Sequence, residues 1–365
     1  MRRVILTVFI VLFLTPASFA SQDVKYAGFA FVGDSADIPV KFKYTDQINQ
    51  EKDTNGMSVF DRQFLEFFKG NATAMPGINL SFLKESEIKL VMALALTREN
   101  VSVVNIDDVY KVVVSLSCNL VFLNFDGMTV AATYPIYLEY VDARTELPDE
   151  AYKKQLVAKL YFDDAFSIKQ LLKDRLKNIG LKNDGVLNMK ILNVVLEDAA
   201  KEKLTLYKDD FAAFESVAAQ RLSDVLSSKL NISILPYAKD FLTGKMSLRF
   251  SNAEVQNFQI PDASYGIDFT LRKLTKDLYK EGVGDNAFLY GAYTTVKVYD
   301  PELARTYWEE KVKFGAVKSI PKLQKTFDDF SVFDEMTGLV MGEIVKKIKE
   351  DKKFYKEVIA QCLNR

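Results

Sequence analysis

Apolar residues alternate with other residues along two neighbouring stretches in the first half of the chain, and the same pattern returns in the second half. In the first half the alternating positions are Val112, Val114, Leu116, Cys118, Leu120 and Phe122, followed after Asp126-Gly127 by Val130, Ala132, Tyr134, Ile136, Leu138 and Tyr140. In the second half they are Phe288, Tyr290, Ala292, Val296 and Val298, followed after Asp300-Pro301 by Trp308, Val312 and Phe314. A period of two is typical of strands with one buried face. The halves are related by a shift of 174 residues, the separation of Asp126 and Asp300, which predicts two copies of one unit.

Stretches with helical spacing accompany these strands in both halves. The expected helices cover residues 58–69, 163–180, 211–230 and 330–349, where apolar residues recur at intervals of three and four. Further strands are expected at 25–32, 78–83 and 88–96, and in the second half at 191–196, 232–235 and 267–271. Each half therefore predicts an α/β (α+β-like) unit with helices packed on a mostly antiparallel sheet.

We expect the first unit to span residues 21–185 and the second 186–365, with a polar, glycine-containing connector between them. The second unit contains an extra segment at about 239–262 that has no counterpart in the first. Residues 246–250 within it predict one more strand or a β-arm.

Residues 1–20 have the organisation of a secretory leader. Arg2 and Arg3 give a positive start, residues 4–14 are apolar, and Ser18-Phe19-Ala20 supplies small residues at the cleavage positions. We expect cleavage after Ala20 and a mature protein that is periplasmic or secreted. The apolar run is shorter than the roughly 20 residues of a membrane helix, and no cysteine follows the cleavage site to carry a lipid anchor.

The order of elements in the second half resembles two known families. In chain order these elements are a strand, a helix at 211–230, a strand ending Ile232-Ser233-Ile234-Leu235-Pro236-Tyr237, and two long strands hinged at an Asp. This order resembles that of the periplasmic α/β domain of the curli-secretion lipoprotein. It is similar also to that of the amino-terminal domain of the Tol-system β-propeller protein. The resemblance covers about residues 189–320 and implies an α/β fold for each half. This chain departs from both families, because it lacks the lipid-anchor cysteine of the first and the propeller of the second.

The residue composition excludes most catalytic templates. The chain has no histidine and two cysteines, which removes histidine-based nucleophilic pairs, imidazole general bases and the commonest zinc ligands. No glycine-rich phosphate loop or G-x-S-x-G string occurs. We therefore expect no catalytic centre, no cofactor and no metal site.

Paired carboxylates are the remaining candidates for chemistry. Asp163-Asp164 and Asp328-Asp329 precede the expected helices at equivalent places, where they could share a proton or hold calcium. Capping of exposed backbone N–H groups is the favoured interpretation, because Asp is a preferred N-cap. Asp126 and Asp300 are interpreted as turn residues.

Charge and aromatic content indicate which kinds of binding partner to expect. The 48 basic and 49 acidic residues nearly cancel, so the chain has no net positive charge that would attract nucleic acid. Tyr293, Tyr299 and Tyr307 fall on the expected outer face of the second unit and form, with the 239–262 segment, a candidate partner surface. Cys118 is expected in the core, and its pairing with Cys362 is left open.

These patterns predict an exported, non-catalytic envelope protein that acts as a binding or scaffold component, with another envelope protein as its partner. The alternative is a periplasmic solute-binding protein that holds a small molecule between its two units. A carboxylate-based hydrolase is the third class.

Overall fold

The computed structural model of the protein describes residues 21–82, 88–181, 187–241, 244–250, 254–324 and 326–363. The expected leader, residues 1–20, lies outside the described residues. Within the described ranges, no helix is both long and apolar enough to cross a membrane.

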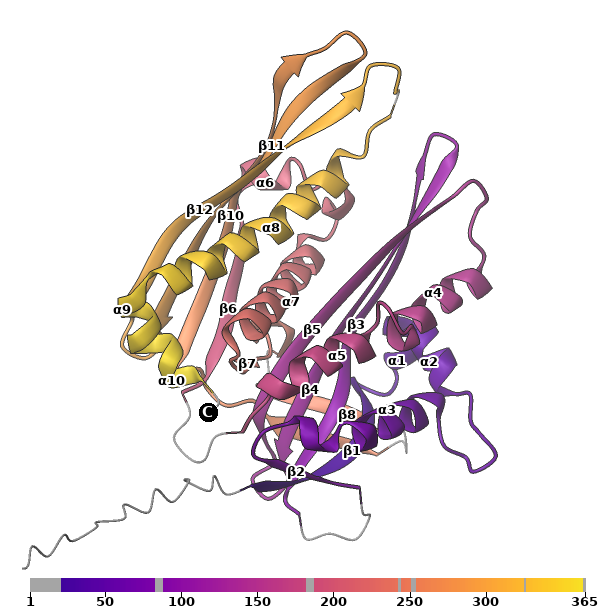
Figure 1. The fold of residues 1–365 in the computed structure, drawn as a ribbon, viewed down its shortest axis with the longest axis vertical. Coiled ribbons are helices and arrows are strands. Elements are labelled where there is room, and N and C mark those ends of the chain that lie inside the picture. The colour runs from indigo at the N-terminus through magenta and orange to yellow at the C-terminus, as the bar shows by residue number, and fades with distance from the viewer. Residues whose placement is uncertain are drawn as a thin grey trace, which may run out of the picture.

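The first unit is built on a sheet with helices on one face (Figure 1). Its strands in chain order are β1 (Gln22–Val32), β2 (Ile78–Ser81), β3 (Leu90–Ile106), β4 (Val109–Asn124) and β5 (Thr129–Arg144). Its helices are α1 (Ile38–Lys41), α2 (Lys43–Asn49), α3 (Val59–Gly70), α4 (Glu150–Phe162) and α5 (Ile168–Arg175). The strands are ordered β2-β1-β3-β4-β5, with β1 parallel to β2 and β3 and the other neighbours antiparallel.

The second unit repeats this connectivity. Its own strands are β6 (Met189–Leu196), β7 (Ile234–Leu235), β10 (Tyr265–Glu281), β11 (Asp285–Asp300) and β12 (Arg305–Pro321). Its helices are α6 (Asp198–Lys201), α7 (Phe211–Leu230), α8 (Asp329–Glu350), α9 (Lys352–Phe354) and α10 (Ala360–Cys362). The sheet order β7-β6-β10-β11-β12, with β6 parallel to β7 and β10, matches the first sheet strand for strand.

The predicted fold class is confirmed: helices pack on two mixed, mostly antiparallel sheets. The alternating residues of β4 and β11 point into two separate cores beneath the helices. Asp126 and Asp300 both lie at the turn between the last two strands of their sheets, as the shared pattern predicts. In both units the long strands extend past the helices at one end of the molecule (Figure 1).

The 239–262 segment lies apart from the second sheet. Its strands β8 (Lys245–Phe250) and β9 (Val255–Gln259) form a hairpin that pairs with β1 and β5 of the first sheet. The hairpin covers the sheet face opposite the helices, where Met246, Leu248 and Phe258 are fully buried. The sequence contained a signal that this second face is covered: residues 91–96 are an unbroken apolar run, which indicates a strand buried on both faces.

The single helix expected at 163–180 is wrong. The chain instead forms α4, which the sequence analysis missed, and then the separate helix α5. Asp163 ends α4, and its carboxylate accepts the backbone N–H groups of Ala165 and Phe166 in the turn. The N-cap of α5 is Ser167, whose hydroxyl accepts the Gln170 N–H. Asp163 lies four residues before the N-cap of α5, and the turn already occupies its carboxylate, so it does not cap that helix.

The two cysteines lie in different cores. Cys118 is buried in the first core and Cys362 in the second, and no disulfide joins them. Burial raises the pKa of the Cys118 thiol, which favours its interpretation as a packed hydrophobic residue.

Candidate functional site at the junction of the two units

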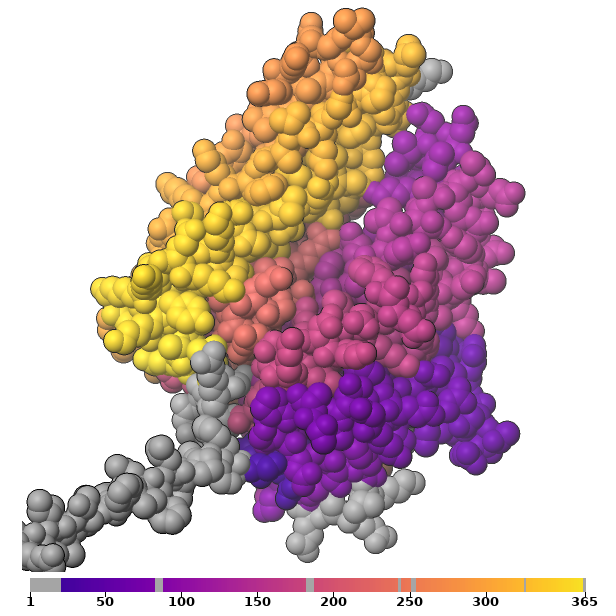
Figure 2. Space-filling model, in the orientation of Figure 1, coloured from indigo at the N-terminus to yellow at the C-terminus, as the bar shows by residue number. Residues whose placement is uncertain are grey.

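Helix α7 has two buried faces with different chemistry. Its apolar stripe packs in the second core, while Ser216, Gln220, Ser223 and Ser227 form a second, polar stripe that is also buried. The helix contacts β5 of the first sheet as well as β6 of its own. In the space-filling view the segment that contains α7 fills the seam between the two units (Figure 2). Helix α7 is therefore the main structural joint of the molecule.

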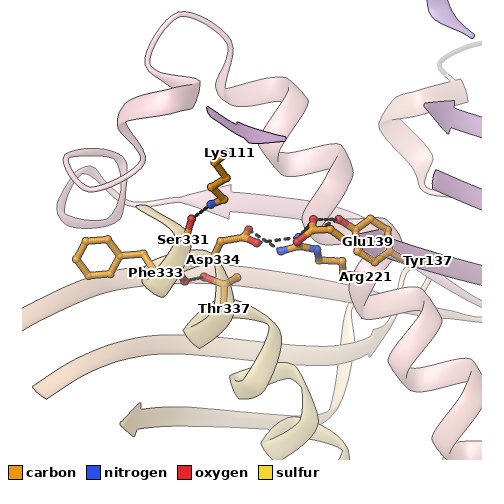
Figure 3. Close-up of polar contacts among 8 residues, drawn as sticks. All are labelled: Lys111, Tyr137, Glu139, Arg221, Ser331, Phe333, Asp334 and Thr337. Carbon is orange, nitrogen blue, oxygen red and sulfur yellow. Dashed lines mark hydrogen bonds and ion pairs between the residues drawn. The ribbon is translucent and has the colours of Figure 1, made fainter. Parts of the chain in front are cut away.

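An ion-pair network centred on Arg221 ties this joint together (Figure 3). Arg221 Nη2 lies 2.6 Å from Glu139 Oε2 of the first sheet, and Nη1 lies 2.5 Å from Asp334 Oδ1 of α8. The guanidinium also donates to the Tyr137 hydroxyl at 2.8 Å, and that hydroxyl donates to Glu139 at 2.6 Å. Burial works to lower the pKa of Arg221, but the carboxylates around it raise that pKa well above its ordinary value. The network is thus charged and cross-links three elements of two units.

Further polar contacts join the units on either side of this network. Arg175 of α5 lies 2.7 Å from Asp224 of α7, and both side chains are largely buried. Lys111 of β4 lies 2.6 Å from Asp328 at the start of α8, and it also donates to Ser331 (Figure 3). These contacts are distributed along the seam and join the two units at several points.

A groove of about 760 Å³ lies at the junction, lined by residues of both units. The first unit contributes side chains from the end of β1, from α1 and from the middle of β3, and the second contributes α7, the segment 239–241 and the start of β8. The charged side chains at the groove are Asp34, Asp37, Lys41, Arg98, Glu99, Lys239, Asp240 and Lys245.

Several of these charges are already paired. Lys41 lies 2.9 Å from Asp37, and Lys239 lies 3.1 Å from Glu215. Glu99 accepts the backbone N–H groups of Tyr44 and Thr45 at 2.9 and 2.8 Å. Burial raises the pKa of Glu99, and the hydrogen bonds it accepts oppose that rise.

Arg98 differs from these groups. It is half-buried in β3, directly after an irregularity in the pairing with β4. Within the described ranges its guanidinium has no carboxylate at ion-pair distance and no hydrogen bond. On the other wall, Asp240 accepts a hydrogen bond from Ser216 at 2.6 Å. The groove therefore presents a cation and an anion from opposite units.

The Asp328-Asp329 pair takes part in capping and ion pairing at the start of α8. Asp328 caps α8 by accepting the Ser331 N–H, as expected, and Asp329 lies 2.7 Å from Lys276. Hydrogen bonds from Lys111 and Ser331 outweigh the effect of burial and lower the pKa of Asp328. Among the residues with a described position, no group of three or more acidic or cysteine side chains could hold a metal ion.

The candidate tyrosines occupy two environments. Tyr293 and Tyr299 lie on the same face of β11, and the Tyr299 hydroxyl donates to Asp268 at 3.2 Å. Tyr307 lies at a bulge in β12, and its ring packs edge-on against the buried Tyr265 with centroids 5.4 Å apart. The structure thus places Tyr293 and Tyr299 on one face of β11, six residues apart along the strand, and turns Tyr307 toward the core. The 239–262 strands pair with the first sheet. A partner-binding role for these tyrosines stays a prediction.

The sequence analysis missed the groove residues, although two signals were present. Arg98 and Glu99 are adjacent charges inside an otherwise apolar strand. The buried polar stripe of α7 recurs at helical spacing beside the apolar stripe. A strand interrupted by charge and a helix with two buried stripes both indicate an interface in addition to the core.

Comparison with known proteins gives structural likenesses only. No protein family and no curated protein matches the chain. One similar solved structure is a neuraminyllactose-binding hemagglutinin homologue from Helicobacter pylori, with 13% identity and a TM-score of 0.28 over 49% of this chain and 88% of that one. Another is a minor lipoprotein from Acinetobacter baumannii, with 14% identity and a TM-score of 0.20 over 46% and 91%. A lipoprotein from Neisseria meningitidis has 10% identity and a TM-score of 0.21 over 45% and 99%. These values carry no functional inference.

Proposed function

We propose that this chain is an exported, non-catalytic binding protein of the cell envelope, which takes its ligand in the groove between its two units. The observation that carries this proposal is a groove of about 760 Å³ lined by charged side chains from both units. Ligand pockets have volumes of roughly 300–1,000 Å³ and a few convergent polar groups. The leader-like residues 1–20 support export.

The groove is pre-formed in this proposal. The Arg221 network and the Arg175–Asp224 pair hold the units in one arrangement, so binding does not depend on closure about a hinge. A pre-organised site avoids part of the entropy lost when a mobile site becomes ordered around its ligand. This distinguishes the protein from a solute-binding protein that closes around its ligand.

The absence of catalysis belongs to the same proposal. Hydrolysis by carboxylates needs an acid and a base that face one substrate. Glu99 is engaged by backbone N–H groups, and Asp37 is paired with Lys41. Of the four carboxylates that line the groove, this leaves Asp34 and Asp240, which come from opposite units.

A thermal-shift screen with a library of small metabolites tests the proposal. A ligand at a hundred times its dissociation constant adds about 2.7 kcal/mol to the free energy of unfolding. Val40 is 83% exposed at the groove, so Val40→Trp narrows the groove without disturbing the core. We expect the shift to disappear in this variant and to persist in Val141→Trp, at a position 49% exposed on β5. Equal shifts in both variants would place the ligand elsewhere.

A scaffold that binds another envelope protein is the second candidate, favoured by the distal end of the β10–β11 hairpin. There Tyr279 is 67% exposed, and Leu278 and Val283 are exposed as well. Exposed apolar side chains at a projecting tip are common at protein interfaces. Replacing Tyr279 and Val283 with Ser should reduce cross-linking to one stoichiometric envelope protein, while Leu303→Ala, at an exposed position in the turn between β11 and β12, serves as a control. Unchanged cross-linking in the Ser variant would contradict this role for the tip.

A further inference from the structure

We infer that the groove binds a zwitterionic ligand, an amino acid or short peptide with free termini, whose carboxylate pairs with Arg98 and whose ammonium group pairs with Asp240. This inference rests on the proposed function, because it names the ligand class of the same groove.

Arg98 is the feature that points to a carboxylate. A guanidinium presents five N–H donors in a planar fork that matches a carboxylate, and it stays charged at any physiological pH. Arg98 is half-buried, so its donors are only partly available to water. The more deeply buried Arg175 and Arg221 have carboxylate partners at 2.5–2.7 Å. Arg249 and Arg272 are half-buried and, in the described chain, have no ion pair, but neither lines the groove. Arg98 has no carboxylate partner among the described residues, and a ligand carboxylate could accept the paired N–H groups of its guanidinium.

Asp240 supplies the complementary charge from the other unit. It lies in the helical turn 238–241 at the groove, and Ser216 of α7 donates to its Oδ1 at 2.6 Å. Asp240 is exposed along the groove, yet partial removal from water raises its pKa, while the Ser216 hydrogen bond and the charge of Arg98 act the other way. Both side chains line the groove, and no ion pair within 4.0 Å joins them in the described chain, so each can pair with a separate group of a ligand.

The remaining charges restrict the ligand class. A phosphate or another multivalent anion would have to approach Asp34, Asp37, Glu99 and Asp240 along the same walls. A purely cationic ligand would meet Lys41, Lys239 and Lys245. Between the charges the groove has the apolar side chains of Val32, Phe42 and Phe241. One positive and one negative group joined by a short, partly apolar body match this distribution.

Isothermal titration of the full chain with three tripeptides tests the inference. Trialanine has both charges, N-acetyl-trialanine lacks the ammonium group, and trialanine amide lacks the carboxylate. We expect trialanine to bind, and each blocked peptide to bind at least about tenfold more weakly, since a hydrogen bond to a charged group contributes that much discrimination. Inorganic phosphate should not compete.

Matched variants assign the two charges. Arg98→Gln should remove the preference for trialanine over its amide, and Asp240→Asn should remove the preference over the acetylated peptide. Arg98→Lys keeps the charge but loses the fork, so it should weaken trialanine binding without abolishing it, which also controls for folding. Lys346→Gln, at a lysine of α8 that does not line the groove, should bind trialanine as the wild type does.

The outcomes separate this inference from the proposed function. Equal affinity for the three peptides, or no binding of trialanine while another compound gives a shift that Val40→Trp removes, would overturn the zwitterion inference and leave the groove as a binding site. If neither trialanine nor any library compound binds at the groove, both proposals fall.

Discussion

Arg221 of α7 lies 2.6 Å from Glu139 of β5, so a helix of the second unit is ion-paired to a strand of the first. The same guanidinium lies 2.5 Å from Asp334 of α8. One side chain thus connects the first sheet, the joint helix and the last long helix. Because the arginine side chain is only 11% exposed, this contact is shielded from the solvent that weakens surface ion pairs.

Arg221→Met should lower the free energy of unfolding by about 3 kcal/mol, because removal of one partner leaves Glu139 and Asp334 as unpaired, largely buried charges. Chemical denaturation followed by circular dichroism measures the change. Lys346→Met is the control, since Lys346 pairs with Glu343 on the exposed face of α8. That variant should lose less than about 1 kcal/mol. An Arg221→Met protein as stable as the control would show that the network does not hold the junction.

The pH dependence of stability should change in opposite directions in two variants. Burial raises the pKa of Glu99 in the folded protein, so the wild type loses stability as the pH rises from about 4 through that pKa. The pKa of Asp328 is lowered by Lys111 and Ser331, against the effect of burial. Asp328 therefore contributes stability above its unfolded pKa, and that contribution is lost as the pH falls through its folded pKa.

Melting temperatures between about pH 3 and pH 7 measure both effects. The melting temperature of Glu99→Gln relative to the wild type should rise with pH, since the variant lacks the cost of ionising a buried carboxyl. The melting temperature of Asp328→Asn relative to the wild type should fall over the same range. Parallel curves for the three proteins would contradict both assignments.

Local patterns predicted the elements better than they predicted the contacts between distant segments. The alternation in β4 and β5 and the capping role of Asp328 follow from neighbouring residues alone, and the structure confirms them. Pairing of β8 with β1 joins segments far apart in the sequence, which no local period encodes. The opposition of Arg98 and Asp240 was likewise invisible, because it arises from how α7 and the segment after it pack against the first sheet.

Reducing agent should leave the melting temperature unchanged, because no disulfide joins Cys118 and Cys362. Cys118 is 0% exposed, and burial raises its pKa, so a maleimide should not label it until the protein unfolds. Mass spectrometry after labelling in native and in denaturing buffer measures how much of Cys118 has reacted in each state. Rapid native labelling of Cys118 would contradict its burial in the first core, and a melting temperature that falls with dithiothreitol would contradict the absence of a disulfide.

The hairpin donated by the second half should be required for the stability of the first unit. Phe258 of β9 is 0% exposed, and its ring packs edge-on against Phe125 with centroids 5.1 Å apart. It helps to cover Ala93, Ala95 and Val121 on the face of the first sheet that its own helices leave open.

Phe258→Ala should therefore cost about 3–5 kcal/mol through lost burial and a residual cavity. Hydrogen exchange should show the lost protection in β1 and β3, which lie in the other unit, rather than in β11 and β12. Val255→Ala, at a position 42% exposed on the same strand, is the matched control and should leave both stability and exchange nearly unchanged. Loss of protection confined to the second sheet would mean that the hairpin stabilises its own unit instead of the first.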